Sequence, residues 1–180
     1  AKKHGFLEEK NLLVRSFKVM GDGALGSRGA LLKKPYSDDP HNHGLLTTSL
    51  ADMKRYASLA ELTGYQLNIH AIGDSTNRLV LELIQNYSKK NPDHRWRIEH
   101  AQVIDPADFD LLGSSGAFPS VQPTHAVSDQ RWAESRLGKA RLRGAYAYNT
   151  LLQKAGMLAI GTGFPVESTN PFLTIHAAVN

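Results

Sequence analysis

The sequence predicts an α/β protein built on a parallel sheet. Short apolar runs alternate with amphipathic stretches of helical period, and each run ends in a Gly, Asp or Pro turn. The chain has 180 residues, 41% of them hydrophobic and 21% charged, which is typical of a folded globular protein. This pattern accommodates five β/α units, whose strands are expected at residues 12–20, 65–71, 96–103, 117–122 and 157–161.

The first unit joins its strand to its helix through a long loop. A glycine-rich stretch, Gly21 to Gly29, and a polar segment with two prolines precede a helix expected over residues 49–63. Ser49 and Asp52 have the spacing of an N-terminal capping pair. Gly64 stands where a left-handed C-terminal cap belongs.

The later units have shorter connections. The second helix is expected over residues 75–88, with its apolar side chains spaced for one buried stripe. Pro106 opens a short helix, because proline is favoured at the first helical position. A longer helix is expected over residues 138–154, and a last helix begins at Asn170-Pro171.

Composition excludes several classes of function. The formal charge is +4 and the pI about 9.3, but Lys and Arg are spread along the chain rather than gathered in one stripe, so no nucleic-acid partner is expected. The chain has no cysteine, which excludes disulfides, thiolate metal sites and a thiol nucleophile. Any metal must therefore use nitrogen and oxygen ligands.

No membrane partner is expected either. No apolar run approaches the roughly 20 residues of a membrane span. The first five residues, Ala1 to Gly5, have no apolar signal core behind them. Because a longer parent's targeting signal would not be visible here, localisation stays open, with the cytoplasm favoured.

Three titratable residues fall at or near predicted strand ends. Lys18 lies late in the first strand, His70 ends the second and His100 lies late in the third. Two histidines on adjacent strand ends can converge on one ion through neutral imidazole nitrogens, although a buried, hydrogen-bonded pair is the alternative. Lysine is protonated at neutral pH, so Lys18 ligates only after deprotonation or carboxylation and is otherwise a surface or salt-bridged lysine.

Several linked motifs resemble, in order, the YtcJ-like branch of the amidohydrolase superfamily. They are Phe17-Lys18-Val19-Met20-Gly21-Asp22-Gly23-Ala24-Leu25-Gly26-Ser27-Arg28-Gly29-Ala30, His70-Ala71-Ile72-Gly73-Asp74, Ile98-Glu99-His100-Ala101-Gln102, Gln122-Pro123-Thr124-His125 and Arg131-Trp132-Ala133-Glu134. Together they cover nearly the whole chain, and their shared order is more specific than any one motif.

The resemblance implies the C-terminal part of a TIM-type (β/α)8 barrel, about strands 4 to 8, over residues 1–180. A closed barrel usually needs about 250 residues, so the length agrees with a partial barrel. It also implies a hydrolase of carbon–nitrogen bonds other than peptide bonds, acting through metal-activated water with one or two divalent ions, usually zinc. Lys18 then matches the strand-four lysine, often carboxylated, while His70 and His100 match the strand-five and strand-six histidines.

Two departures from the family pattern predict impaired chemistry. The strand-one His-x-His pair belongs well before Lys18, outside this sequence, and Gly163 stands where the family generally has its strand-eight aspartate. Glycine offers neither a ligand oxygen nor a base. Asp74, Glu99 or Glu167 are alternative bases but less favoured, so this fragment alone is expected to be inactive.

The same resemblance suggests substrate contacts at Asp22, Arg28, His125 and Trp132. Two of them have simpler alternatives, a loop salt bridge for Arg28 and ordinary loop packing for Trp132. His41-Asn42-His43 spells a His-x-His motif but lies in a polar loop, so it is not expected to ligate a metal.

Two functional hypotheses remain open. The first is a fragment of a metal-dependent hydrolase acting on a small amide-like substrate. The second is a non-catalytic scaffold or regulatory binding protein derived from an amidohydrolase, suggested by Gly163 and the missing strands. In either case the open sheet edges of a partial barrel predict a homo-oligomer or pairing with a missing N-terminal half.

Overall fold

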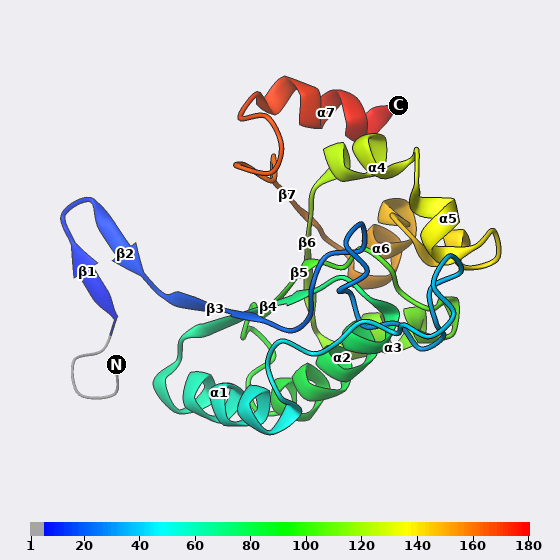
Figure 1. Ribbon diagram of the computed structural model, residues 1–180. Helices are drawn as coiled ribbons and strands as arrows, with labels where there is room; N and C mark the ends of the chain where they lie inside the picture. The colour runs from blue at the N-terminus through cyan, green and yellow to red at the C-terminus, as the bar shows by residue number, and fades with distance from the viewer. Residues whose placement is uncertain (1–5) are drawn as a thin grey trace.

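The computed structural model describes residues 6–180, so the segment 1–5 and the prediction about its missing signal core lie outside the described residues. The chain forms a two-stranded hairpin and a five-stranded parallel sheet with order β3-β4-β5-β6-β7 (Figure 1). The strands are β1 (Leu7–Glu9), β2 (Leu12–Val14), β3 (Ser16–Met20), β4 (Gln66–Ala71), β5 (Arg97–His100), β6 (Phe118–Val121) and β7 (Ala159–Ile160).

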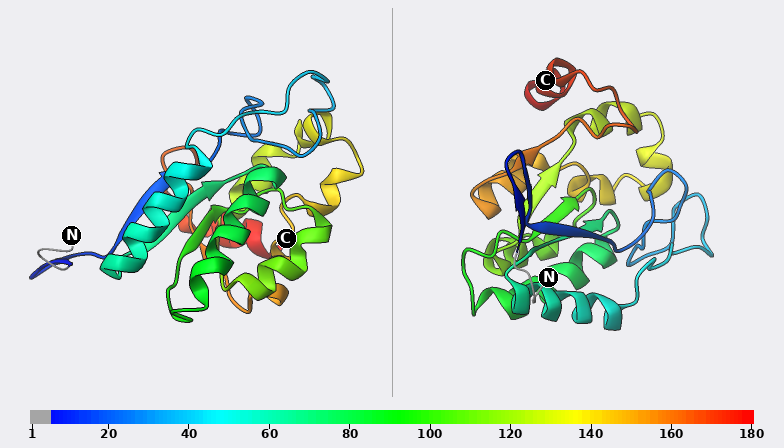
Figure 2. Two further views of the ribbon diagram at one scale, coloured as in Figure 1. Left: turned by 90° about the horizontal axis from the view of Figure 1, so that it is seen from below. Right: turned by 90° about the vertical axis from the view of Figure 1, so that its left-hand side faces the viewer.

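The helices follow the strands in chain order. They are α1 (Leu50–Thr63), α2 (Asp74–Ser88), α3 (Phe109–Ser115), α4 (Pro123–Asp129), α5 (Ala133–Leu137), α6 (Tyr148–Ala155) and α7 (Pro171–Val179), with short 3-10 helices at Pro106–Asp108 and Arg141–Gly144. Helices α1, α2, α3 and α6 pack side by side in that order, and α1 to α3 cover one face of the sheet (Figures 1 and 2).

This arrangement confirms the predicted α/β fold of repeated β/α units. Each successive strand pairs in parallel with the one before it, as in part of a TIM-type barrel. Among residues 6–180, β3 and β7 do not pair, so the sheet is open and no closed barrel is present. No helix in this part of the chain has both the length and the apolarity to cross a bilayer.

The first predicted strand, 12–20, is divided in the structure. Only Ser16–Met20 pairs with β4, starting at the register Ser16↔Gln66. The residues before it fold back as an antiparallel hairpin, in which Leu7 pairs with Val14, and this hairpin extends away from the sheet (Figure 1). The strand prediction was too long because β4 offers no partner before Gln66.

Helix α1 forms as predicted. The Ser49 hydroxyl accepts a hydrogen bond from the Asp52 N–H at 3.1 Å and donates to the Asp52 carboxylate at 2.8 Å. Gly64 has φ 76° and donates its N–H to the Ala60 carbonyl, which caps the C-terminus. These local interactions are what the sequence pattern identifies.

The predicted helix over 138–154 was wrong in its first half, since only its second half forms a helix, α6. Residues 144–146 instead run beside the segment that follows β5, with the Ile104 N–H donating to the Gly144 carbonyl and the Tyr146 N–H to the Gln102 carbonyl. A Cβ at Gly144 would lie 1.9 Å from the Ile104 carbonyl oxygen, so glycine permits this approach. The backbone thus forms β-like bonds across the chain in place of helical ones.

Two apolar clusters hold the fold together. The larger lies between the sheet and its helices and includes Ile69, Ile98 and Ile84, all fully buried. A smaller cluster orders the long loop 21–47 by burying Leu25 and Tyr36 with neighbouring apolar side chains. Burying each such side chain contributes about 1.5–3 kcal/mol to the free energy of folding, so the two clusters stabilise both the sheet and the loop.

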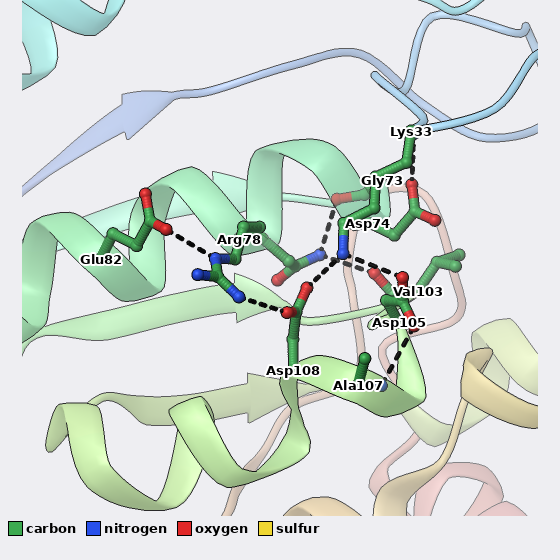
Figure 3. Close-up of polar contacts among 10 residues, drawn as sticks. Lys33, Gly73, Asp74, Arg78, Glu82, Val103, Asp105, Ala107 and Asp108 are labelled. Atoms are coloured by element: carbon green, nitrogen blue, oxygen red, sulfur yellow. Dashed lines mark hydrogen bonds and ion pairs between the residues drawn. The ribbon is translucent and has the colours of Figure 1, made fainter.

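An ionic network fastens the long loop to α2 and to the start of α3 (Figure 3). The Lys33 ammonium donates to Asp108 at 2.6 Å and to Asp105 at 2.9 Å, while Arg78 donates to the other oxygen of Asp108 at 2.7 Å. The Lys33 N–H donates to the Asp74 carboxylate at 2.8 Å. Asp74 therefore has a structural position at the N-terminus of α2.

Candidate metal centre

The C-terminal ends of β3 to β6 surround a cavity of about 570 Å³, here named the rim pocket. Strand register sets the ends of β3, β4 and β5 side by side there, with Met20 beside His70 and Ala71 beside His100. Its lining includes Lys18, His70, His100, His125, Trp132 and Gly163. The three candidate metal ligands therefore share one cavity.

The His70 and His100 rings lie next to each other, with centroids 4.6 Å apart and an interplanar angle of 70°. Burial lowers the pKa of each imidazole to about 4, and the nearby Lys18 charge acts in the same direction. Both rings are consequently neutral at pH 7. The neutral ring is the form that carries a lone pair for a metal.

A neighbouring glutamine fixes the tautomer of His100. His100 Nδ1 lies 2.7 Å from Gln122 Oε1, and the Gln122 amide nitrogen donates to the Ser120 carbonyl at 3.3 Å. Because an amide oxygen only accepts, Nδ1 carries the proton and Nε2 keeps its lone pair. This is the orientation that metal-binding histidines receive from a hydrogen-bonding neighbour.

The backbone at the end of β5 is strained. His100 has φ 77° and Ala101 φ 44°, both in the left-handed region that residues with a Cβ rarely adopt. Each such residue costs on the order of 1–3 kcal/mol, and such strain clusters at functional sites. The strained turn sets the direction of the His100 ring.

His70 holds a buried nitrogen without a partner. Its ring donates to the Gly23 carbonyl, which raises its pKa and partly opposes burial. Nε2 is buried and makes no hydrogen bond, with Asp22 Oδ1 3.5 Å away. A buried polar atom without a partner is costly, and a ligand at this position relieves that cost.

Lys18 faces the same side of the sheet as His70. It pairs with Asn68, two residues before His70, and side chains two positions apart on a strand share a face. Within residues 6–180, no group of three or more His, Cys, Asp or Glu side chains is arranged to hold a metal ion. The donor set thus fits an ion through two imidazoles, with Lys18 as third ligand only in a neutral or carboxylated form.

Asp22 and Arg28, both predicted to contact substrate, bind other parts of the chain in the structure. Asp22 is fully buried and accepts backbone hydrogen bonds from Leu31, Ile72 and Gly73 at 2.9–3.0 Å, so its carboxylate clamps the loop to the end of β4. Arg28 makes a two-pronged ion pair with Asp38 at 3.0 Å, which is the loop salt bridge considered as its alternative. Neither side chain lines the rim pocket.

His125 and Trp132 do line the rim pocket. His125 Nδ1 lies 3.0 Å from a Glu167 carboxylate oxygen, which also accepts from the Ser128 hydroxyl at 2.7 Å. The Trp132 ring packs closely on Gly26, where an added Cβ would approach it to 3.2 Å. Both residues are therefore held in place by neighbours.

The sequence matches the Amidohydrolase family over residues 2–180. The chain belongs to the amidohydrolase family. It is 38% identical over 164 residues to a protein of Bacillus subtilis (strain 168) named "Putative amidohydrolase YtcJ", covering 91% of this chain and 31% of that protein. It is 34% identical over 171 residues to the protein LONG AFTER FAR-RED 3 of Arabidopsis thaliana, covering 93% of this chain and 29% of that protein.

Solved structures extend this likeness to the fold. An uncharacterized metal-dependent hydrolase from Pyrococcus horikoshii OT3 superposes with a TM-score of 0.87 at 33% identity, over 98% of this chain and 35% of that one. Another from Pyrococcus furiosus gives a TM-score of 0.89 at 31% identity, over 98% and 36%. The amidohydrolase chain thus spans about a third of the length of these relatives.

Gly163 faces His125. Its φ is +80°, and a Cβ added there would lie 3.0 Å from His125 Cε1. Of the suggested replacement bases, Glu99 lines the rim pocket but pairs with Arg97 at 3.0 Å. Glu167 is held by His125, and Asp74 is not part of the lining.

Sequence reasoning missed several polar residues of the rim pocket. Gln102 and Gln122 follow the ends of β5 and β6, and both lie within the motifs that carried the family resemblance. Their place at the C-terminal ends of predicted strands was the signal that could have found them. Asp129 had no such signal, because it ends helix α4, away from any predicted strand.

Proposed function

We propose that residues 1–180 form the C-terminal portion of a metal-dependent amidohydrolase barrel domain that hydrolyses carbon–nitrogen bonds of small amide-like substrates. In this proposal Lys18, His70 and His100 bind one divalent ion, zinc. The observation that carries it is the pair of neutral imidazoles with centroids 4.6 Å apart in one cavity. The metal-dependent hydrolases of similar fold support it.

The residues of the proposed metal site have separate roles. A bound zinc ion would polarise a substrate carbonyl and lower the pKa of water. Gln122 holds His100 in the ligating tautomer, and burial keeps both imidazoles free of protons. Lys18 contributes only after losing its proton, which limits the ion to two firm ligands and predicts weak binding.

The proposed chemistry lacks an evident general base for proton transfer. A general base must lie within hydrogen-bond reach of the attacking water, and Gly163 has no side chain to offer. The carboxylates nearby are engaged by Arg97 or His125. We therefore propose that the chain alone has low or absent turnover, although it keeps metal affinity.

Zinc titration by calorimetry tests this proposal. The chain is expected to bind one zinc ion, and His70→Ala is expected to abolish that binding. His41→Ala is the matched control, since His41 is exposed in the long loop outside the rim pocket. Zinc binding unaffected by His70→Ala would refute the ligand assignment, and robust hydrolysis of N-acetyl amino acids by the chain alone would refute its incompleteness.

Gly163 also favours a second candidate, a non-catalytic binding protein that retains the fold as a scaffold. The close approach of His125 to Gly163 supports it, because this packing fits glycine and not a strand-eight aspartate. The two candidates differ when the chain is combined with the missing N-terminal strands of a relative. Zinc-dependent turnover of that complex favours the hydrolase, and zinc binding without turnover favours the scaffold.

We also propose that the open sheet pairs with a second polypeptide, either another copy or an N-terminal half. Exposed apolar side chains after β6 and β7 support this, with Phe164 65% and Val166 82% exposed. Light scattering of the chain at micromolar concentration is expected to give a mass above 19.8 kDa. A clean monomer would contradict self-association.

A further inference from the structure

A carboxylate in the rim pocket lacks a cationic partner. Two carboxylates line the pocket within residues 6–180, Glu99 and Asp129. Glu99 pairs with Arg97 at 3.0 Å, whereas Asp129 makes no ion pair with any described residue. A carboxylate facing a cavity with only neutral partners is a natural site for a ligand cation.

Neutral donors hold one oxygen of Asp129 and leave the other available. The Tyr146 hydroxyl donates to Oδ2 at 2.7 Å and the Gln102 amide to the same oxygen at 3.2 Å. Oδ1 has only the Ser128 hydroxyl at 3.5 Å, the limit of a hydrogen bond. A carboxylate oxygen accepts more than one such bond, so Oδ1 is free to take a ligand donor.

The backbone is arranged to keep this cluster in place. Tyr146 has φ 52°, a left-handed conformation unusual for a residue with a Cβ. Its N–H donates to the Gln102 carbonyl at 2.7 Å, and the Gln102 amide donates to the Tyr146 hydroxyl at 3.0 Å. Asp129 is thus positioned by two segments, one after β5 and one before α6.

The surroundings indicate the rest of the ligand. Leu25, Ile72 and Trp132 add apolar walls to the pocket that Asp129 and the histidine pair also line. The Trp132 N–H donates to the Asp129 carbonyl at 3.0 Å, which keeps the aromatic ring and the carboxylate on the same turn. An apolar wall next to a carboxylate suits an aliphatic chain that ends in an ammonium group.

We infer that Asp129 is a specificity-determining residue that selects amide-like substrates whose far end carries a primary ammonium group. The ammonium would donate to Asp129 Oδ1 while the amide lies toward His70 and His100. This inference rests on the proposed function for the amide end only. Recognition of the ammonium end needs neither the metal nor turnover.

Three matched amides test the inference on the metal-free 180-residue chain. They are N-(5-aminopentyl)acetamide, which is cationic, N-hexylacetamide, which is neutral, and 6-acetamidohexanoate, which is anionic. Calorimetry is expected to show the cationic amide binding roughly tenfold more tightly than the neutral one, the value of one charge-assisted hydrogen bond. The anionic amide is expected to bind most weakly.

Substitutions test whether Asp129 causes the preference for the cationic amide. Asp129→Asn keeps the shape of the side chain and is expected to bring the cationic and neutral amides to similar affinity. Asp110→Asn is the control, because Asp110 is an exposed carboxylate on α3 paired with Lys154, and it should keep the preference. Nuclear Overhauser contacts from the methylene next to the ammonium to the Tyr146 ring are expected in the wild-type chain, so the test does not depend on the fold of a variant.

The possible results separate this inference from the proposed function. A cationic preference lost in Asp129→Asn supports it even where no zinc binding or hydrolysis is measured. Equal affinity for the cationic and neutral amides overturns it even where zinc binds normally. A preference retained in a folded Asp129→Asn chain, or ligand contacts away from Tyr146, also overturns it.

Discussion

Removing the carboxylate of Asp22 is expected to destabilise the chain more than any exposed acidic substitution. Asp22 is fully buried and joins the long loop to the end of β4 through three backbone N–H groups. Two of these belong to Ile72 and Gly73, directly after the segment that carries His70. Its loss therefore acts on both the fold and the proposed metal site.

The magnitude follows from the bonds that Asp22 accepts. A buried donor left without an acceptor costs about 1–3 kcal/mol, so the three donors freed by Asp22→Ala cost about 3–6 kcal/mol when water enters in part. Burial also raises the pKa of Asp22, so part of this loss is offset by removing a carboxylate that was costly to bury. Asp22→Asn keeps one acceptor oxygen and is expected to cost about 2 kcal/mol.

Urea unfolding followed by circular dichroism measures the difference in stability between these variants and the wild-type chain. Total stabilities of single domains are about 5–15 kcal/mol, so Asp22→Ala should shift the midpoint strongly or prevent folding. Asp110→Ala removes a carboxylate that is 90% exposed and should leave the midpoint unchanged. Equal midpoints for Asp22→Asn, Asp110→Ala and the wild-type chain would refute the claim that the Asp22 carboxylate holds the long loop against β4.

Three further predictions follow from single contacts. Gln122→Leu removes the acceptor that fixes the His100 tautomer, so zinc affinity measured by calorimetry should fall about 10- to 100-fold; an unchanged affinity would contradict that role. Gly163→Ala places a Cβ at φ +80° against His125 and should lower unfolding free energy by about 1–2 kcal/mol in urea, whereas equal stability would argue against the strain. Asp105 has a pKa lowered mainly by a lysine hydrogen bond, so its stabilisation is present above about pH 4 and lost as the pH falls further. Asp105→Asn should therefore flatten the acid limb of stability against pH, and an unaltered limb would contradict this.

Local signals predicted the regular elements well. The helix expected over 49–63 begins and ends as α1 does, because Ser49 and Gly64 act through neighbouring residues only. The strand expected over 65–71 matches β4 within one residue. Such elements depend on hydrophobic periodicity and on capping residues, and both can be recognised within a short stretch of sequence.

Elements decided by distant contacts were not predictable in the same way. The first half of the helix expected over 138–154 does not form because Gly144 and Tyr146 bond to residues about 40 positions earlier, a pairing that no local pattern reveals. Helix α4 was missed because its seven residues show too short a period, although Pro123 suits a helix start.

The residues of the candidate site differ in the same way, since local patterns predicted some of them and distant contacts determine the others. Their place at strand ends selected His70 and His100, and both line one pocket in the structure. The burial of Asp22 and its three backbone partners depend on how the loop folds back, so no local pattern indicated them. The hydrogen bonds of Asp129 could not be found from sequence, since they depend on the tertiary position of Tyr146.

Anomalous diffraction at the zinc absorption edge tests the central claim most directly. The account predicts one peak in crystals soaked with zinc, bonded at about 2.0–2.1 Å to one imidazole nitrogen each of His70 and His100, with the Lys18 side chain turned toward it. A peak at His41 and His43, or none in the rim pocket at saturating zinc, would contradict it.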